Sequence, residues 1–230
     1  MILSAAGDAT LETLDFETGS VKRVLSGHTD RVRAVIVTAG GRQIVSASDD
    51  RSIRIWDPDT GTVQCVINTQ RHWTRALAST LDGKTLVSGS DDRTLKVWNL
   101  ADGTELRTLR RHDARVNTVA VSPDGQWVIS GSDDRLVKVW NLSAGAEVMV
   151  LKGHEAKVNG VAIDSHGKYL YSASDDFTIK AWDLASGQLL ATYTGDSRML
   201  ACASGQHGMI VAGDQTGRLH FLNLDSADDQ

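Results

Sequence analysis

Residues 128–141 read VISGSDDRLVKVWN, and this phrase has three close copies at residues 44–57, 86–99 and 170–183. The copies read IVSASDDRSIRIWD, LVSGSDDRTLKVWN and LYSASDDFTIKAWD. The tryptophan that nearly ends each phrase recurs at intervals of 42 residues, at positions 56, 98, 140 and 182. A repeat of this length predicts an array of similar structural units that stack on one another.

Fainter copies of the phrase lie at both ends of the chain. ILSAAGDATLETLD at residues 2–15 precedes the first strong copy by one repeat length, and IVAGDQTGRLHFLN at residues 210–223 follows the last one after a two-residue deletion. We therefore predict a single domain over residues 1–224 and an acidic, flexible tail over residues 225–230. The copies that make up the domain cover about residues 2–25, 28–67, 70–109, 112–151, 154–193 and 196–224.

Short segments within each copy predict strands, and no segment shows a sustained helical period. VRAVIVT (32–38) and VNTVAVS (116–122) are rich in β-branched residues, and the phrases IRIW and VKVW alternate apolar with basic residues. SPDG at residues 122–125 supplies turn chemistry between such segments. Each strong copy therefore predicts a four-stranded antiparallel sheet, while the first copy lacks its first strand and the last copy lacks its fourth. Radial stacking of such sheets gives an all-β propeller.

The overall composition narrows the range of functions. A chain of 230 residues with 41% hydrophobic and 23% charged residues is an ordinary globular sequence. Its net charge of −5 argues against nucleic acid and anionic membranes as partners. The two cysteines are too few for a disulfide framework, and we find no secretory signal and no apolar run of bilayer length. We expect a soluble, cytoplasmic protein.

The motifs resemble a known repeat family. GHTDRVRAV (27–35), a loop and IVSASDDRSIRIWD, repeated in register, are similar to WD40 repeats over residues 2–224. The resemblance implies a β-propeller with four complete blades and two partial ones, either six-bladed or a piece of a larger ring. It also implies a non-enzymatic scaffold or sensor that binds a protein or peptide on the face around the central channel.

A second, looser resemblance concerns the end of the chain. AGDQTGRLHFLNL (212–224) is similar to the last blade of WD40 domains at the C-terminus of bacterial signal-transducing NTPases. This similarity implies a sensor or scaffold whose effector domain lies upstream or on another chain.

Several copies contain serine, histidine and aspartate, which are the residues of a nucleophilic triad. Their recurrence at separate positions argues against one active site, so we predict no catalytic residues and no cofactor. The WD40 resemblance instead implies a hydrogen-bonded chain from Trp through Ser and His to Asp within each blade. These network residues are His28, Ser46, Asp50, Trp56, Ser88, Asp92, Trp98, His112, Ser130, Asp134, Trp140, His154, Ser172, Asp176 and Trp182.

Two copies depart from this pattern. One has Gln70 in place of the histidine, with His72 two positions later, so we expect its network to be weakened or rerouted. The last copy has lost the network residues. We therefore predict that its stability depends on the packing of four apolar residues, Ile210, Val211, Leu219 and Phe221.

The partner-binding prediction also follows from the resemblance. The residue before each network aspartate and the residues flanking the start of the innermost strand are expected to lie on the narrower face around the channel. This set comprises Arg31, Arg33, Asp49, Trp73, Arg75, Asp91, Arg115, Asp133, Lys157 and Asp175. Trp73 stands where the other copies have arginine or lysine, and a tryptophan flanked by arginines is typical of a binding hot spot. Alternatively, Trp73 covers His72 or the channel mouth.

Three further alternatives concern the function. Aspartates on separate blades are too far apart to bind one metal ion, and no histidine or cysteine cluster has zinc spacing, so we expect no metal. The chain could be an oligomerising fragment whose incomplete blades are completed by another chain. A propeller enzyme that uses the central channel would need unusual polar residues in one or two blades, and the sequence offers only repeating ones.

Overall fold

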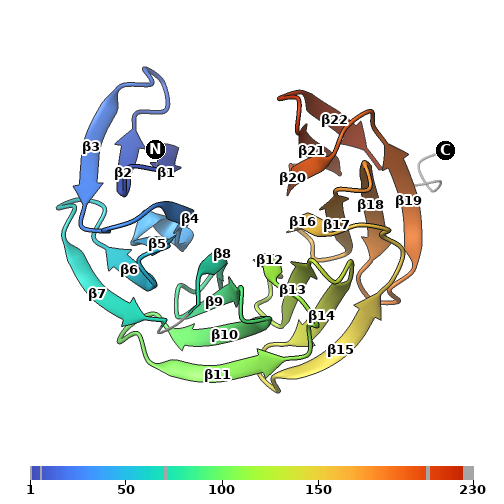
Figure 1. The fold of residues 1–230 in the computed structure, drawn as a ribbon, viewed down its shortest axis with the longest axis horizontal. Coiled ribbons are helices and arrows are strands. Elements are labelled where there is room, and N and C mark those ends of the chain that lie inside the picture. Colours follow the sequence, from blue (N-terminus) through green and yellow to red (C-terminus); the bar gives the residue numbers. More distant parts are fainter. Residues whose placement is uncertain (1, 6, 70–71, 206–207, 225–230) are drawn as a thin grey trace. The chain divides into compact units, whose positions relative to one another are not determined.

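The computed structural model describes residues 2–5, 7–69, 72–205 and 208–224. The chain forms two compact units, Met1–Arg110 and Arg111–Gln230, and the described residues of each unit form three antiparallel sheets (Figure 1). Among the described residues, helical structure is limited to one short 3₁₀ turn, η1 (Ala39–Gly41), and no helix is long and apolar enough to cross a bilayer.

The first unit begins with a three-stranded sheet and continues with two four-stranded sheets. Within each sheet, strands that follow one another in sequence are paired. The strands are β1 (Ile2–Ala5), β2 (Thr10–Leu14) and β3 (Val21–Ser26); β4 (Val32–Val37), β5 (Ile44–Ser48), β6 (Ser52–Trp56) and β7 (Val63–Asn68); β8 (Thr74–Ser79), β9 (Thr85–Ser90), β10 (Thr94–Asn99) and β11 (Glu105–Arg110).

The second unit has the reverse order, with two four-stranded sheets before a three-stranded one. Its strands are β12 (Val116–Val121), β13 (Trp127–Ser132), β14 (Val137–Asn141) and β15 (Ala146–Leu151); β16 (Val158–Ile163), β17 (Tyr169–Ser174), β18 (Thr178–Asp183) and β19 (Leu189–Thr194); β20 (Met199–Ser204), β21 (Met209–Asp214) and β22 (Leu219–Asn223). The prediction of an all-β chain with four complete blades between two partial ones is confirmed.

The repeated SDD phrase, at residues 44–57, 86–99, 128–141 and 170–183, forms the second strand, a tight turn and the third strand of each four-stranded sheet. The residue after the two aspartates takes a left-handed conformation, with φ of 67° at Arg51 and 71° at Arg135. This conformation is uncommon for a non-glycine residue, because its Cβ crowds the backbone. The amide of Arg51 donates to the carbonyl of Ser48 at 3.1 Å, which closes the turn and sets the register of β5 against β6.

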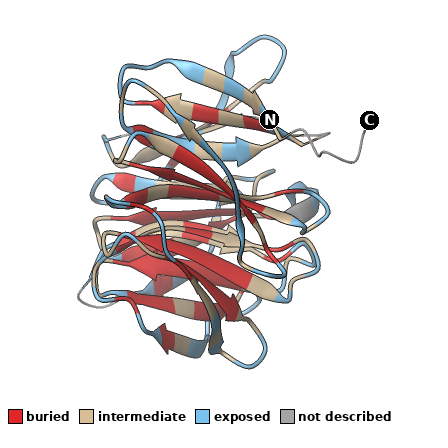
Figure 2. Ribbon diagram, turned by 90° about the vertical axis from the view of Figure 1, so that its right-hand side faces the viewer, coloured by how far each residue is buried: buried red, intermediate tan, exposed pale blue. Residues whose placement is uncertain are grey.

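The core of each unit lies between consecutive sheets. In the first unit, Leu11 and Leu25 contact Ile44 and Trp56 of the following sheet, and all four side chains are buried. Figure 2 shows that buried residues gather on the strands, whereas the connecting loops are mostly exposed. A sheet of this size cannot bury both faces by itself, so the stacking of neighbouring sheets supplies most of the hydrophobic stabilisation.

The predicted core of the last sheet is partly wrong. Ile210 is buried, but Leu219 and Phe221 are 64% and 67% exposed. In the preceding sheet, the equivalent residues Ile179 and Ala181 lie on the face that β20–β22 covers. No described sheet of the second unit covers the corresponding face of β22, so apolar residues that follow the repeat remain at the surface.

Candidate functional site

The second aspartate of each phrase caps the tight turn. In the first unit, Asp50 Oδ1 accepts hydrogen bonds from the amide of Ser52 at 2.8 Å and from its hydroxyl at 2.7 Å. The other oxygen, Oδ2, accepts the amide of Thr29 at 3.2 Å and faces Nδ1 of His28 at 2.7 Å. One carboxylate therefore holds the turn and the loop that enters the first strand.

Behind this carboxylate, a chain of hydrogen bonds enters the core. Trp56 Nε1 donates to Ser46 Oγ at 2.8 Å, and the same hydroxyl lies 2.7 Å from Nε2 of His28. The imidazole also makes an edge contact with the Trp56 ring, with centroids 5.9 Å apart. The Trp–Ser–His–Asp chain thus connects the third strand, the second strand, the entry loop and the turn.

The second unit contains two further complete Trp–Ser–His–Asp hydrogen-bond networks with nearly the same geometry. His112 lies 2.6 Å from Asp134 and 2.8 Å from Ser130, whose hydroxyl accepts from Trp140 at 2.9 Å. The corresponding distances in the following sheet are 2.8, 2.7 and 2.9 Å, and they join His154, Asp176, Ser172 and Trp182.

The chain of donors runs in one direction when the histidine is neutral. The indole N–H donates to serine, the serine O–H donates to Nε2, and the Nδ1–H donates to the carboxylate, so every donor has an acceptor. Burial lowers the pKa of His28 and of His154, and the neighbouring carboxylates only partly offset this effect. Burial raises the pKa of Asp50, but hydrogen bonds from Ser52 and His28 outweigh it and the net pKa is lowered.

The same balance applies to the corresponding aspartates in the second unit. Burial raises the pKa of Asp134 and of Asp176, and the hydrogen bonds to their carboxylates again bring the net pKa below its usual value. For the pairs His28–Asp50 and His154–Asp176, the pKa shifts therefore favour a neutral histidine beside an ionised aspartate, which is the pairing that the hydrogen-bond chain requires.

Among the residues that the structure describes in the third sheet, the two ends of this arrangement are present. Trp98 Nε1 donates to Ser88 Oγ at 2.9 Å, and Asp92 Oδ1 accepts from the amide and hydroxyl of Thr94 at 3.0 and 2.6 Å. His72 is exposed, and Gln70 lies outside the described residues.

The last sheet has a polar network that comparison of the repeats within the chain did not predict. Asp214 Oδ2 lies 3.0 Å from Nε2 of His220, whose Nδ1 lies 3.0 Å from the hydroxyl of Tyr193. The hydrogen bond from His220, followed by that from Thr216, lowers the pKa of Asp214. Asp214 and His220 occupy the positions of Ser174 and Lys180 in the preceding copy, so comparison with the repeat gave no sign that they interact.

The first aspartate of each phrase is less exposed than predicted. Its side chain is 9% exposed at Asp49 and 23% exposed at Asp133, because basic or amide side chains lie across it. Arg33 binds Asp49 through Nε at 2.8 Å and Nη2 at 2.6 Å, and Arg75 makes the equivalent paired contact with Asp91. These bidentate pairs fix two planar guanidinium groups at the surface of the first unit.

Trp73 lies beside these ion pairs. The guanidinium carbon of Arg33 lies 5.6 Å from the centroid of the Trp73 ring, and Trp73 is 41% exposed. The carbonyl of Trp73 accepts the amide of Asp91 at 3.1 Å, which anchors the backbone of the tryptophan. We call Arg33, Asp49, Trp73, Arg75 and Asp91 the Trp73 cluster. Arg31 is exposed, and its carbonyl accepts the amide of Asp49 at 2.9 Å.

The predicted residues in the second unit form smaller pairs. Asp133 lies 3.0 Å from Nε of Arg115 and accepts from Nδ2 of Asn117 at 2.7 Å. Asp175 accepts from Asn159 at 2.7 Å and lies 3.5 Å from Lys157, with Arg198 at 3.7 Å as an additional cation that we did not predict.

The complete networks offer poor access to a substrate. Ser46, Ser130 and Ser172 are fully buried, and each hydroxyl already contacts a tryptophan and a histidine. Among the described residues, no group of three or more His, Cys, Asp or Glu side chains could hold a metal ion. The geometry therefore favours a structural role for the networks.

Comparisons with known proteins agree with this repeat architecture. The family model for the "WD domain, G-beta repeat" matches residues 19–57, 63–99, 103–141 and 145–183. A curated relative, "Lissencephaly-1 homolog" from Caenorhabditis briggsae, is 39% identical over 44 residues, which is 19% of this chain. The matched segment spans only 11% of that relative.

Proposed function

The chain belongs to the WD40-repeat family, whose members generally act as non-enzymatic scaffolds for protein interactions, and we propose that it binds a protein or peptide through the Trp73 cluster. The observation that carries the proposal is the large exposed fraction of Trp73 beside an arginine already fixed by a carboxylate. Tryptophan and arginine are the residue types that contribute most to binding energy at protein interfaces.

The geometry of the cluster supports this role. The carboxylates of Asp49 and Asp91 hold Arg33 and Arg75 in place before a partner arrives, so binding loses little side-chain entropy there. Trp73 offers a broad apolar surface with few rotatable bonds. The cluster therefore suits a partner segment that places an apolar side chain on the indole and hydrogen-bond acceptors against the guanidinium groups.

Trp73→Ala tests this proposal. We expect a loss of about 2 kcal/mol of binding free energy, which is roughly a thirtyfold weaker dissociation constant, and an unchanged melting temperature. Phe16→Ala is the matched control, because Phe16 is a 75% exposed aromatic residue of the same unit, in the turn between β2 and β3. Equal recovery of the partner by wild type and Trp73→Ala in a pull-down would refute the proposal.

Self-association is a second candidate, favoured by the exposed face of β22. Leu219 and Phe221 occupy positions whose equivalents are buried against the next sheet within the same unit, namely Ile53 and Ile55 in the first unit and Ile179 and Ala181 in the second. This face thus has the composition of an inter-sheet contact, and a second copy of the chain could cover it. A sensor role coupled to an effector domain stays a prediction from the looser resemblance.

A further inference from the structure

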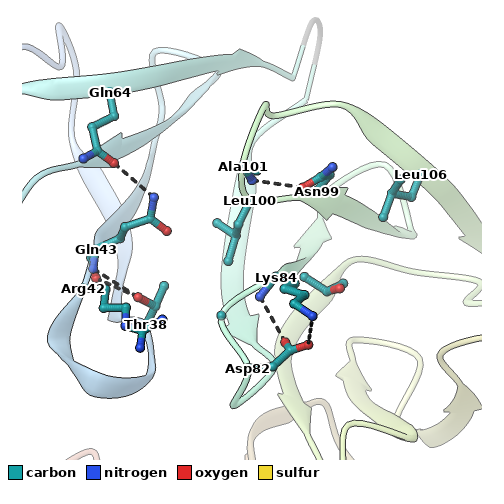
Figure 3. Close-up of a pocket in the computed structure, with 12 residues that line it drawn as sticks. Thr38, Arg42, Gln43, Gln64, Asp82, Lys84, Asn99, Leu100, Ala101 and Leu106 are labelled. Carbon is teal, nitrogen blue, oxygen red and sulfur yellow. Dashed lines mark hydrogen bonds and ion pairs between the residues drawn. The ribbon is translucent and has the colours of Figure 1, made fainter.

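A groove between the second and third sheets of the first unit lies apart from the Trp73 cluster. It has a volume of about 690 Å³, within the range of roughly 300–1,000 Å³ typical of ligand sites. Figure 3 shows Gln43 and Gln64 on one side, with Leu100, Asn99 and Lys84 on the other. The turns before β5 and β9, together with the turn after β10, form its walls.

The repeat itself shows what is unusual about this groove. The equivalent hollow between the first two sheets of the second unit has a volume of about 300 Å³. Trp127 and Val148 occupy there the positions of Gln43 and Gln64, and Trp127 packs against the core of that unit. With two glutamines in place of a tryptophan and a valine, the groove of the first unit is larger and contains two more side chains that can form hydrogen bonds.

The polar groups of the groove retain unused hydrogen-bonding capacity. Gln43 Nε2 donates to Gln64 Oε1 at 3.0 Å, and Asn99 Oδ1 accepts the amide of Ala101 at 3.0 Å. Within the described part of the chain, neither Gln43 Oε1 nor Asn99 Nδ2 makes a hydrogen bond. These two groups can therefore accept from and donate to a peptide backbone that enters the groove.

The charged groups favour an anionic ligand. Arg42 lines the groove and makes no ion pair within the described residues, and Lys84 lies 3.9 Å from Asp82. The side chains of Lys84 and Asp82 are 81% and 55% exposed, so this single long contact is weak and a ligand carboxylate can replace it. In the equivalent groove of the second unit, glutamine takes the position of Arg42.

Apolar surface lies beside these cations. Leu100 is buried at the wall of the groove, and Leu106 is 56% exposed. We propose that this groove binds a short, extended peptide segment in which an aspartate or glutamate is next to an aliphatic residue. The carboxylate contacts Arg42 and Lys84, the aliphatic side chain packs on Leu106, and the backbone pairs with the amides of Gln43 and Asn99.

A phage-displayed library of random octapeptides tests the proposal. The library is selected on the wild-type chain after depletion on Gln43→Trp, a variant that places in this groove the residue found at position 127. We expect the remaining peptides to be enriched in acidic residues next to leucine, isoleucine or valine. A melting temperature equal to that of the wild type shows that Gln43→Trp is folded.

Fluorescence polarisation of the most enriched peptide then locates its site. Lys84→Glu should weaken binding by about tenfold or more. Lys168→Glu changes the same charge at the equivalent position of the second unit and should leave the affinity within about twofold, as should Trp73→Ala. The inference would be overturned if no peptides remain after depletion, or if the selected peptides bind Lys84→Glu as tightly as the wild type. Neither result would affect the proposal for the Trp73 cluster.

Discussion

Replacing Asp134 by alanine removes the acceptor of three hydrogen bonds at once. Its carboxylate faces Nδ1 of His112 at 2.6 Å and accepts the amides of Asp113 at 3.1 Å and Leu136 at 3.0 Å. The side chain of His112 is fully buried, so its N–H would be left without an acceptor. A hydrogen bond to a charged group contributes about 1.5–3 kcal/mol, and a stranded buried donor costs about 1–3 kcal/mol. We therefore expect a loss of about 3–5 kcal/mol in unfolding free energy.

Replacing the neighbouring Asp133 has a smaller expected effect. Its partner Arg115 has a side chain that is 54% exposed, and water can solvate the guanidinium after the carboxylate is removed. Asn117 Nδ2 retains its hydrogen bond to the carbonyl of Val158 at 3.0 Å. Asp133→Ala should therefore cost about 1 kcal/mol or less.

Urea unfolding followed by tryptophan fluorescence measures the difference. With a slope of about 2 kcal/mol per molar urea, Asp134→Ala should lower the midpoint by about 2 M and Asp133→Ala by about 0.5 M. Asp134→Asn should fall between them, because its amide oxygen still accepts a hydrogen bond. Equal midpoints for the two alanine variants would show that the two aspartates do not have different structural roles.

Two other predictions concern pH and self-association. Burial keeps the pKa of His28 and His154 below the value of 6.5 expected in the unfolded chain, so the unfolded state gains protons first as the pH falls. The urea midpoint should therefore decrease as the pH falls below about 6.5. The decrease should be less steep in a His28→Gln, His154→Gln double variant. A midpoint that stays constant or rises in acid would contradict this prediction. Sedimentation velocity should show concentration-dependent association of the wild type that Phe221→Ser reduces, and a wild type that is monomeric at every concentration would exclude association through β22.

The repeat made most of the fold predictable. Four phrases in register locate the strands and turns, because alternation, turn residues and the recurring tryptophan all indicate the same sheet. The resemblance to WD40 repeats also allowed us to predict residues that the structure brings together in three hydrogen-bonded networks, such as His112, Ser130 and Asp134.

The features that the sequence did not reveal depend on contacts between repeats or within one irregular copy. The repeat pattern alone cannot show whether a neighbouring sheet covers Leu219, or that Asp214 meets His220 across the last turn. The groove beside Gln43 is likewise absent from the sequence pattern. It becomes apparent only when the hollow there is compared with the one that Trp127 occupies.

We propose that the buried networks stabilise the fold and that the exposed Trp73 cluster recognises the partner. Measuring melting temperature and partner recovery together, for Trp73→Ala and Asp134→Asn, tests that assignment most directly. We expect Trp73→Ala to lose the partner with an unchanged melting temperature. Asp134→Asn should melt at a lower temperature yet recover the partner while it remains folded. The opposite result, in which folded Asp134→Asn loses the partner and Trp73→Ala binds it normally, would contradict this division of roles.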